Sequence, residues 1–123
     1  MKIIRFKDIE NVPASHEDPK NPGVLKKVLL RQSDFINGVV KMVNWATLLS
    51  GKAYAEHFHE DMQEVSIIIS GIAIAHVDGV EITLAHGDVL VVDPKEVHQM
   101  RNPGSEPVIF LALGISGGKP VLA

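Results

Sequence analysis

Short runs of β-branched and other apolar residues alternate with turn residues along most of the chain. The runs span residues 24–30, 38–48, 64–70, 72–77, 80–84, 89–92 and 108–113. Strands spaced this evenly are typical of an all-β sandwich or barrel. No segment of ten or more residues repeats its apolar positions every 3.6 residues, so we expect little helix, with one turn near residues 6–11.

The clearest local prediction is a hairpin between the runs 72–77 and 80–84. Asp78 and Gly79 stand between apolar flanks. An Asp-Gly pair supplies the two positive-φ positions that a tight type I′ turn requires. We therefore expect these two runs to pair directly as antiparallel strands.

Residues 1–22 differ from the rest of the chain because they are mostly polar and are interrupted by Pro13, Pro19 and Pro22. This pattern predicts a short edge strand followed by a mobile arm. The remaining residues, 23–123, are predicted to form one β-barrel, since a chain of 123 residues with 46% apolar residues suits a single compact core.

Charge and composition exclude several classes of partner. The formal net charge is −3, from 12 basic and 15 acidic residues, and neither sign gathers into a block. We therefore expect no nucleic-acid and no membrane partner. The first seven residues are too short and too charged for a signal-peptide core, which predicts a soluble, cytoplasmic protein. The absence of cysteine excludes disulfides, thiolate metal sites and a cysteine nucleophile.

The first candidate site lies between Gly51 and Gly71. His57 and His59 are two residues apart, and positions two apart on a strand share a face. Glu64 follows after the connection 60–63 and is expected to open the next strand, facing the two imidazoles. Imidazole nitrogen and carboxylate oxygen together suit Zn, Cu, Fe, Ni and Mn.

A second stretch, from Gly87 to Asn102, adds a fourth candidate ligand. A turn around residues 93–95 delivers His98 at the start of a further strand. On a regular strand Gln99 and Arg101 point away from the metal, whereas Met100 points toward it.

These two stretches resemble the two motifs of the cupin superfamily. The first motif, G-x5-H-x-H-x4-E-x6-G, is matched at every fixed position by Gly51, His57, His59, Glu64 and Gly71. The second, G-x5-P-x-G-x2-H-x3-N, is matched by Gly87, His98 and Asn102. Asp93 stands where its proline is usual and Lys95 where its glycine is usual, so we expect a variant turn.

The resemblance covers about residues 38–113 and implies a double-stranded β-helix, or jelly-roll barrel, formed by a single cupin domain. It also implies that His57, His59, Glu64 and His98 hold one divalent transition metal inside the barrel mouth. The ion is Mn, Fe, Ni, Zn, Co or Cu, since the same ligand set accepts each of them.

Other polar and aromatic residues are given simpler interpretations. His16, His76 and His86 are expected to be solvated or locally hydrogen-bonded, and the turn residues 95–96 to be a solvated loop. The aromatic residues Trp45 and Tyr54 each line a pocket, pack in the core or anchor an interface; these alternatives stay open.

Alternation along the run 64–70 predicts an apolar outer face. If Glu64 points into the barrel, then Val65, Ile67 and Ile69 point outward, as does Phe58 between the two histidines. A contiguous apolar patch of this kind is costly to leave in water. We therefore predict a homodimer packed through this face, with residues 23–30 added from the partner.

Three functions are compatible with these features. The first is a mononuclear metal-dependent enzyme acting on a small organic acid, a keto or enol compound or a sugar derivative, of dioxygenase, decarboxylase or isomerase type. The second is a binding or sensing module in which the metal anchors a small molecule without turnover. The third is a structural oligomer with incidental metal. No catalytic acid or base is identified by the sequence.

Overall fold

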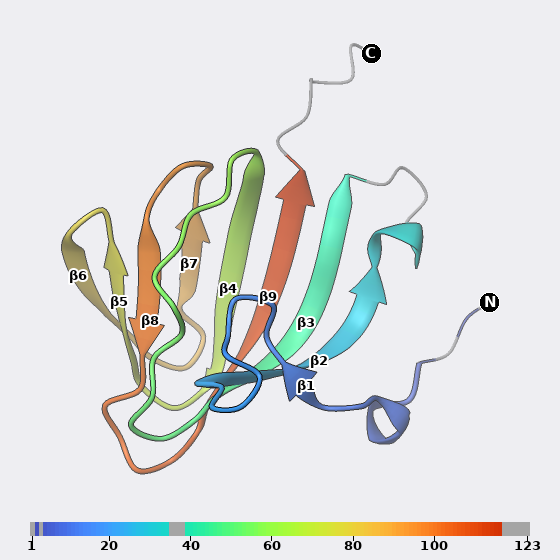
Figure 1. Ribbon diagram of the computed structural model, residues 1–123, viewed down its shortest axis with the longest axis horizontal. Coiled ribbons are helices and arrows are strands. Elements are labelled where there is room, and N and C mark those ends of the chain that lie inside the picture. Colours follow the sequence, from blue (N-terminus) through green and yellow to red (C-terminus); the bar gives the residue numbers. More distant parts are fainter. Residues whose placement is uncertain (1, 3, 35–38, 117–123) are drawn as a thin grey trace.

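The computed structural model describes residues 2, 4–34 and 39–116, and almost all of them lie in or between β-strands (Figure 1). The strands are β1 Val12–Pro13, β2 Val24–Arg31, β3 Val40–Leu48, β4 Met62–Ser70, β5 Ala73–Val77, β6 Val80–Leu84, β7 Val89–Val92, β8 His98–Arg101 and β9 Val108–Ser116. Two short 3-10 helices span Phe6–Asp8 and Gln32–Asp34. Among the described residues, no helix is long and apolar enough to cross a membrane.

The strands form two antiparallel sheets. The larger has the order β1-β2-β3-β9-β4-β7 and the smaller the order β6-β5-β8. An extended segment also runs beside β8, where Ala53 bridges Arg101 and His57 bridges His98. The chain passes repeatedly from one sheet to the other, and the two sheets together form the jelly-roll barrel that the sequence predicts. In Figure 1 the smaller sheet lies at the left, beside the larger one.

The predicted strand positions agree closely with the observed ones. β6 and β7 have the predicted bounds, while β2, β4 and β9 are longer than predicted. The first residue of the predicted strand 38–48, Gly38, lies outside the described residues. The Asp-Gly hairpin is confirmed, since Asp78 and Gly79 have φ angles of +47° and +82° and Val77 pairs with Val80.

Alternation along the strands builds the core. Leu48, Ile68, Met100 and Val108 are fully buried and come from both sheets. On β4 the predicted parity is confirmed, because Glu64, Ser66 and Ile68 are buried while the residues between them are only half-buried. The inner face of the larger sheet therefore carries polar as well as apolar side chains.

The motif positions that hold no candidate ligand shape the loops. Gly51, Gly71 and Gly87 have φ angles of +71°, +91° and +84°, in the left-handed region that favours glycine. The Asn102 side-chain amide donates to Leu48 O at 3.1 Å and to Glu106 O at 2.7 Å. These residues fix the connections from which the site is built.

The N-terminal segment lies against the barrel. β1 is the predicted short edge strand, and it pairs with β2. After it, the Glu17 carboxylate accepts hydrogen bonds from Gly23 N at 2.8 Å and Ala55 N at 3.0 Å. The arm therefore makes specific contacts with the barrel, and its mobility stays a prediction. β2 itself pairs with β1 and β3 of the same chain.

Candidate metal centre

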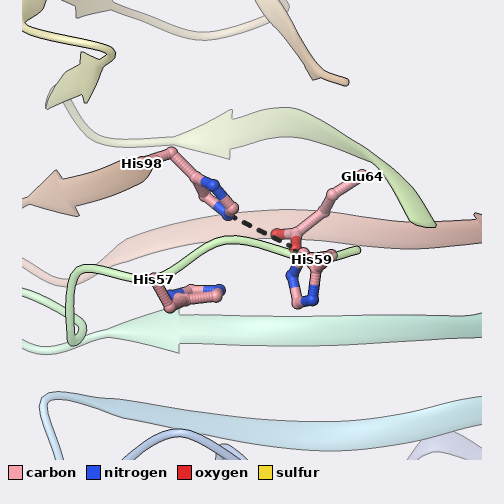
Figure 2. A group of neighbouring side chains, drawn as sticks. All are labelled: His57, His59, Glu64 and His98. Atoms are coloured by element: carbon pink, nitrogen blue, oxygen red, sulfur yellow. Dashed lines mark hydrogen bonds and ion pairs between the residues drawn. The ribbon is translucent and has the colours of Figure 1, made fainter. Parts of the chain in front are cut away.

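Three separate stretches bring the four predicted ligands together. His57 and His59 come from the connection between β3 and β4, Glu64 from β4 and His98 from β8. One nitrogen or oxygen atom of each lies within 4.8 Å of the corresponding atoms of the other three (Figure 2). This separation matches atoms that surround one ion, so the predicted convergence is present in the structure.

The local structure of the two histidines differs from the prediction in one respect. They lie on an extended connection rather than on a regular strand, and Glu64 is the third residue of β4 rather than its first. His57 N donates to His98 O at 3.1 Å, and His98 N donates to His57 O at 2.9 Å. This isolated bridge replaces the predicted strand, and it positions two candidate ligands through the backbone.

The variant turn before His98 keeps the glycine-like conformation. Lys95 has a φ angle of +71°, which costs a residue with a side chain about 1 kcal/mol. Its backbone N–H donates to His59 O at 2.7 Å, and the Glu96 carboxylate accepts from Asp93 N at 2.7 Å. Lys95 is exposed as predicted, whereas the Glu96 side chain caps the turn instead of being simply solvated.

Two of the imidazoles are oriented by backbone carbonyls. His57 Nδ1 lies 2.6 Å from Ala55 O, and His98 Nδ1 lies 2.9 Å from Glu96 O. Each Nδ1–H donates to its carbonyl, which leaves Nε2 unprotonated in the neutral ring. His98 Nε2 is buried and has no hydrogen-bond partner among the described residues. A buried nitrogen that lacks a partner and faces a carboxylate suits coordination to a cation.

The charges in the cluster favour a cation as well. Burial alone would raise the pKa of Glu64, but the imidazoles of His98 and His59 outweigh it and lower that pKa. His59 Nε2 lies 3.1 Å from the Glu64 carboxylate and His98 Nε2 lies 3.8 Å from it. Burial lowers the pKa of His57 to about 4, because it outweighs the Ala55 carbonyl and the Glu64 charge, which act in the opposite direction. An ionised carboxylate and a neutral imidazole are the forms that bind metal.

The cluster opens onto a cavity of about 270 Å³ inside the barrel. His57, His59 and Glu64 line it. Much of the remaining wall is apolar and consists of Val24, Met42, Ala46, Met62, Phe110 and Ala112. A molecule in this cavity therefore has direct access to an ion held by the four side chains.

The two aromatic alternatives are now distinguished. Tyr54 lines the cavity, with its ring centroid 5.4 Å from that of His57. Burial raises the pKa of the Tyr54 hydroxyl well above its usual range, so this group stays protonated. Trp45 packs edge-on against Phe6, with ring centroids 5.3 Å apart, and does not line the cavity.

Sequence reasoning missed one residue of the site, His16. Its ring stacks on His57 with centroids 3.9 Å apart, and it lies 5.4 Å from His59. It is exposed, as predicted, but it also lines the cavity, and the prediction did not include this contact with the site. No spacing pattern links it to the motifs. Its position follows from the Glu17 hydrogen bonds that fasten the arm beside Ala55.

The remaining histidine predictions are confirmed. His76 Nε2 lies 3.2 Å from the exposed Glu81 carboxylate, and His86 Nδ1 lies 3.1 Å from Ile69 O. The alternation on β8 is confirmed as well, with His98 and Met100 buried. Met100 nevertheless packs in the core and is absent from the cavity wall.

The model of the cupin domain family matches residues 44–114, which is more than half of the chain. The chain is a cupin. The match begins on β3 and ends on β9, so it includes all four candidate ligands and excludes the arm that carries His16. The sequence matches none of the curated proteins.

Solved structures support the same family. A predicted oxalate decarboxylase from Thermotoga maritima is 25% identical with a TM-score of 0.82, covering 94% of this cupin and 99% of that chain. An uncharacterized conserved protein with a double-stranded β-helix domain from Klebsiella pneumoniae is 28% identical with a TM-score of 0.68, covering 84% and 85%. KdgF from Halomonas sp. is 15% identical with a TM-score of 0.74, covering 98% and 96%, and shows likeness of fold alone.

Proposed function

We propose that this cupin is a mononuclear metal-dependent enzyme that acts on a small organic acid or a related keto, enol or sugar compound. One observation carries the proposal. Three of the four candidate ligands line a cavity whose volume suits a small molecule, so a substrate in the cavity meets the ion directly. A bound divalent ion would polarise a carbonyl or carboxylate oxygen of such a substrate as a Lewis acid.

The chain's own residues would prepare the site for this chemistry. His57, His59, Glu64 and His98 hold the ion, and the carbonyls of Ala55 and Glu96 orient two of these rings. The apolar part of the wall supplies surface against which a small substrate can pack beside the ion. Tyr54 offers a neutral hydroxyl as a hydrogen-bond donor beside the metal centre.

The similarity to the protein from Thermotoga maritima supports an acid as substrate. That protein is described as a predicted oxalate decarboxylase, and it shares 25% of its sequence with this cupin over nearly the whole of both chains. The reaction type stays open among decarboxylation, dioxygenation and isomerisation, because one fold hosts many chemistries.

A second candidate function is a binding or sensing module that holds an acid at the metal without turnover. The apolar character of the wall favours it, because apolar surface supplies affinity but no proton transfer. Turnover distinguishes the two functions. An enzyme loses activity on chelation and regains it with one particular ion, whereas a binding module releases its ligand unchanged.

The first test measures metal in the purified protein by elemental analysis. We expect about one equivalent in the wild type, and almost none in the double variant His57→Ala/His59→Ala. The double variant His76→Ala/His86→Ala, which removes two histidines outside the centre, is the matched control and should retain the metal. Equal metal content in all three proteins would refute the proposed ligand set.

A further inference from the structure

The cavity contains a second polar region, separate from the metal centre. Its side chains are Lys26 on β2, Asn44 on β3 and Ser15 on the arm. In the larger sheet β9 separates β3 from β4, which carries Glu64. Asn44 and Glu64 thus stand on strands two interstrand spacings apart, roughly 10 Å along the sheet. A ligand bound at the metal can extend toward this region.

Lys26 supplies a positive charge there. It pairs with the buried residue Ala46, so its side chain projects from the inner face of the sheet. Among the described residues that line the cavity it is the one lysine or arginine. Its Nζ donates to Ser15 Oγ at 3.0 Å, and the described residues provide no acidic partner within salt-bridge distance. Burial also lowers the pKa of Lys26, as expected for an ammonium group partly removed from water.

Asn44 supplies an unused acceptor. The residue is only 5% exposed, and its Oδ1 is buried with no hydrogen-bond partner among the described residues. Its Nδ2 is directed at Met42 Sδ, 2.9 Å away. A buried amide oxygen without a donor is unfavourable by about 1–3 kcal/mol. Asn44 lines the cavity, so rotation of its amide toward the cavity would bring this oxygen to a ligand hydroxyl and remove that penalty.

We propose that this second region recognises the distal end of the substrate, which carries a second anionic group and at least one hydroxyl. The anionic group, a carboxylate in the simplest case, pairs with Lys26, and the hydroxyl donates to Asn44 Oδ1. The inference rests on the proposed function, since the metal holds the first carboxylate. The substrate class is therefore a hydroxylated dicarboxylic acid rather than a simple monocarboxylate.

The test uses Zn²⁺-loaded protein and isothermal titration calorimetry. Metal affinity is measured first for the wild type and Lys26→Met, and it should be the same in both. Succinate, glutarate and adipate are then compared with butyrate, pentanoate and hexanoate, which have the same chain lengths but lack the second carboxylate. We expect at least one dicarboxylate to bind about tenfold or more tightly than its partner in the wild type. Lys26→Met should remove that preference.

One control isolates the charge of Lys26. Lys41→Met removes an exposed lysine outside the cavity and should keep the wild-type preference. A wild type with no preference at any chain length would overturn the inference, as would a preference that survives in Lys26→Met. Failure of the wild type to bind Zn²⁺ would instead overturn the proposed function on which the inference depends.

Asn44 is tested with adipate and glucarate, which share a six-carbon chain and differ in four hydroxyl groups. The wild type should prefer glucarate, partly because its α-hydroxyl chelates Zn²⁺, and Asn44→Leu should reduce that preference by about tenfold. The variant removes a buried polar group that lacks a partner, so its thermal stability should not fall, and a circular dichroism melt checks this. A preference for glucarate as large in Asn44→Leu as in the wild type would show that this residue does not recognise the hydroxyl.

Discussion

The two faces of the larger sheet have opposite and unusual polarity. Its inner face carries the buried polar residues Glu64, Ser66 and Asn44 among the apolar residues of the core. Its outer face is apolar at the neighbouring positions, and Val89 and Val91 are 53% and 49% exposed. Both features are the reverse of the usual arrangement. We propose that a metal and a small molecule occupy the inside of the barrel and that another surface covers the outside.

The outer face extends beyond the four residues that the sequence predicts. Strand register places its apolar side chains in two adjacent rows across four strands. One row is Val43, Leu113, Val65 and Val91, and the other is Trp45, Leu111, Ile67 and Val89. Burying polar groups is expensive unless they are paired, and exposing a continuous apolar surface is expensive unless it is covered. The homodimer therefore remains our prediction for the outer face.

The largest effect should come from adjacent residues on opposite faces of β4. Glu64→Gln removes the charge of a ligand and should weaken metal affinity by about 100-fold or more. Val65→Thr changes the outer face at the next position and should leave metal affinity unchanged. Competition with a chromogenic chelator measures both. Equal affinities in the two variants would contradict the assignment of the inner face to the metal.

The next effect concerns the outer face. Val91→Lys places a charge in the middle of the predicted interface and should weaken dimerisation by about 100-fold, because the charge would be buried without a partner. Light scattering at micromolar concentration should show a dimeric wild type and a monomeric variant. Val80→Lys is the control, since Val80 is 60% exposed but lies on β6 of the smaller sheet. A monomeric wild type would contradict the prediction that the apolar outer face is covered by a second copy of the chain.

Metal affinity should depend on pH in a defined direction. Burial lowers the pKa of His98, but the Glu64 carboxylate and the Glu96 carbonyl outweigh it, so the net pKa is raised. Because its pKa is raised, His98 becomes protonated at a higher pH than an ordinary histidine, and the proton then competes with the metal. Affinity should therefore be constant above that pKa and fall about tenfold per pH unit below it. His57, with a pKa of about 4, should compete only in more acidic solution. Affinity that rises as the pH falls would contradict this assignment.

The smallest effect concerns the turn that positions His98. Lys95→Gly should stabilise the protein by about 1 kcal/mol, because glycine adopts a φ angle of +71° without steric strain. Thermal denaturation measures the difference. Lys20→Gly is the control, since Lys20 is exposed and has no positive φ angle, and it should give no increase. A destabilised Lys95→Gly variant would show that the lysine side chain has a structural role of its own.

Much of the fold could be predicted because strand positions follow short-range rules, whereas the four candidate ligands could be predicted as one set because the two stretches resemble the cupin motifs. Parity on β4 and β8 correctly placed Glu64 and His98 on inner faces, and the Asp-Gly pair placed the hairpin. Met100, which was expected to point toward the metal, is buried in the core instead. Those rules need only a few consecutive residues. They do not depend on how distant strands are aligned.

The second polar region and His16 could not be predicted for a different reason. Register shifts between Val28 and Leu30, and between Val40 and Met42, interrupt the alternation on β2 and β3. Lys26 and Asn44 lie in the regularly paired parts of these strands, but the cavity that they share depends on how β2 and β3 pair with segments far away in the sequence. His16 is placed by a carboxylate on the next residue that reaches across to the connection before His57. Contacts between segments so far apart in sequence leave no local pattern.

The convergence of three stretches on one centre has a mechanical consequence. An ion bound by ligands from the β3–β4 connection, from β4 and from β8 would act as a reversible crosslink between the two sheets. Since the unfolded chain lacks this arrangement, free ion at 100 times its dissociation constant would add about 2.7 kcal/mol to the free energy of unfolding. The melting temperature of this protein would then report how much of the ion its surroundings supply.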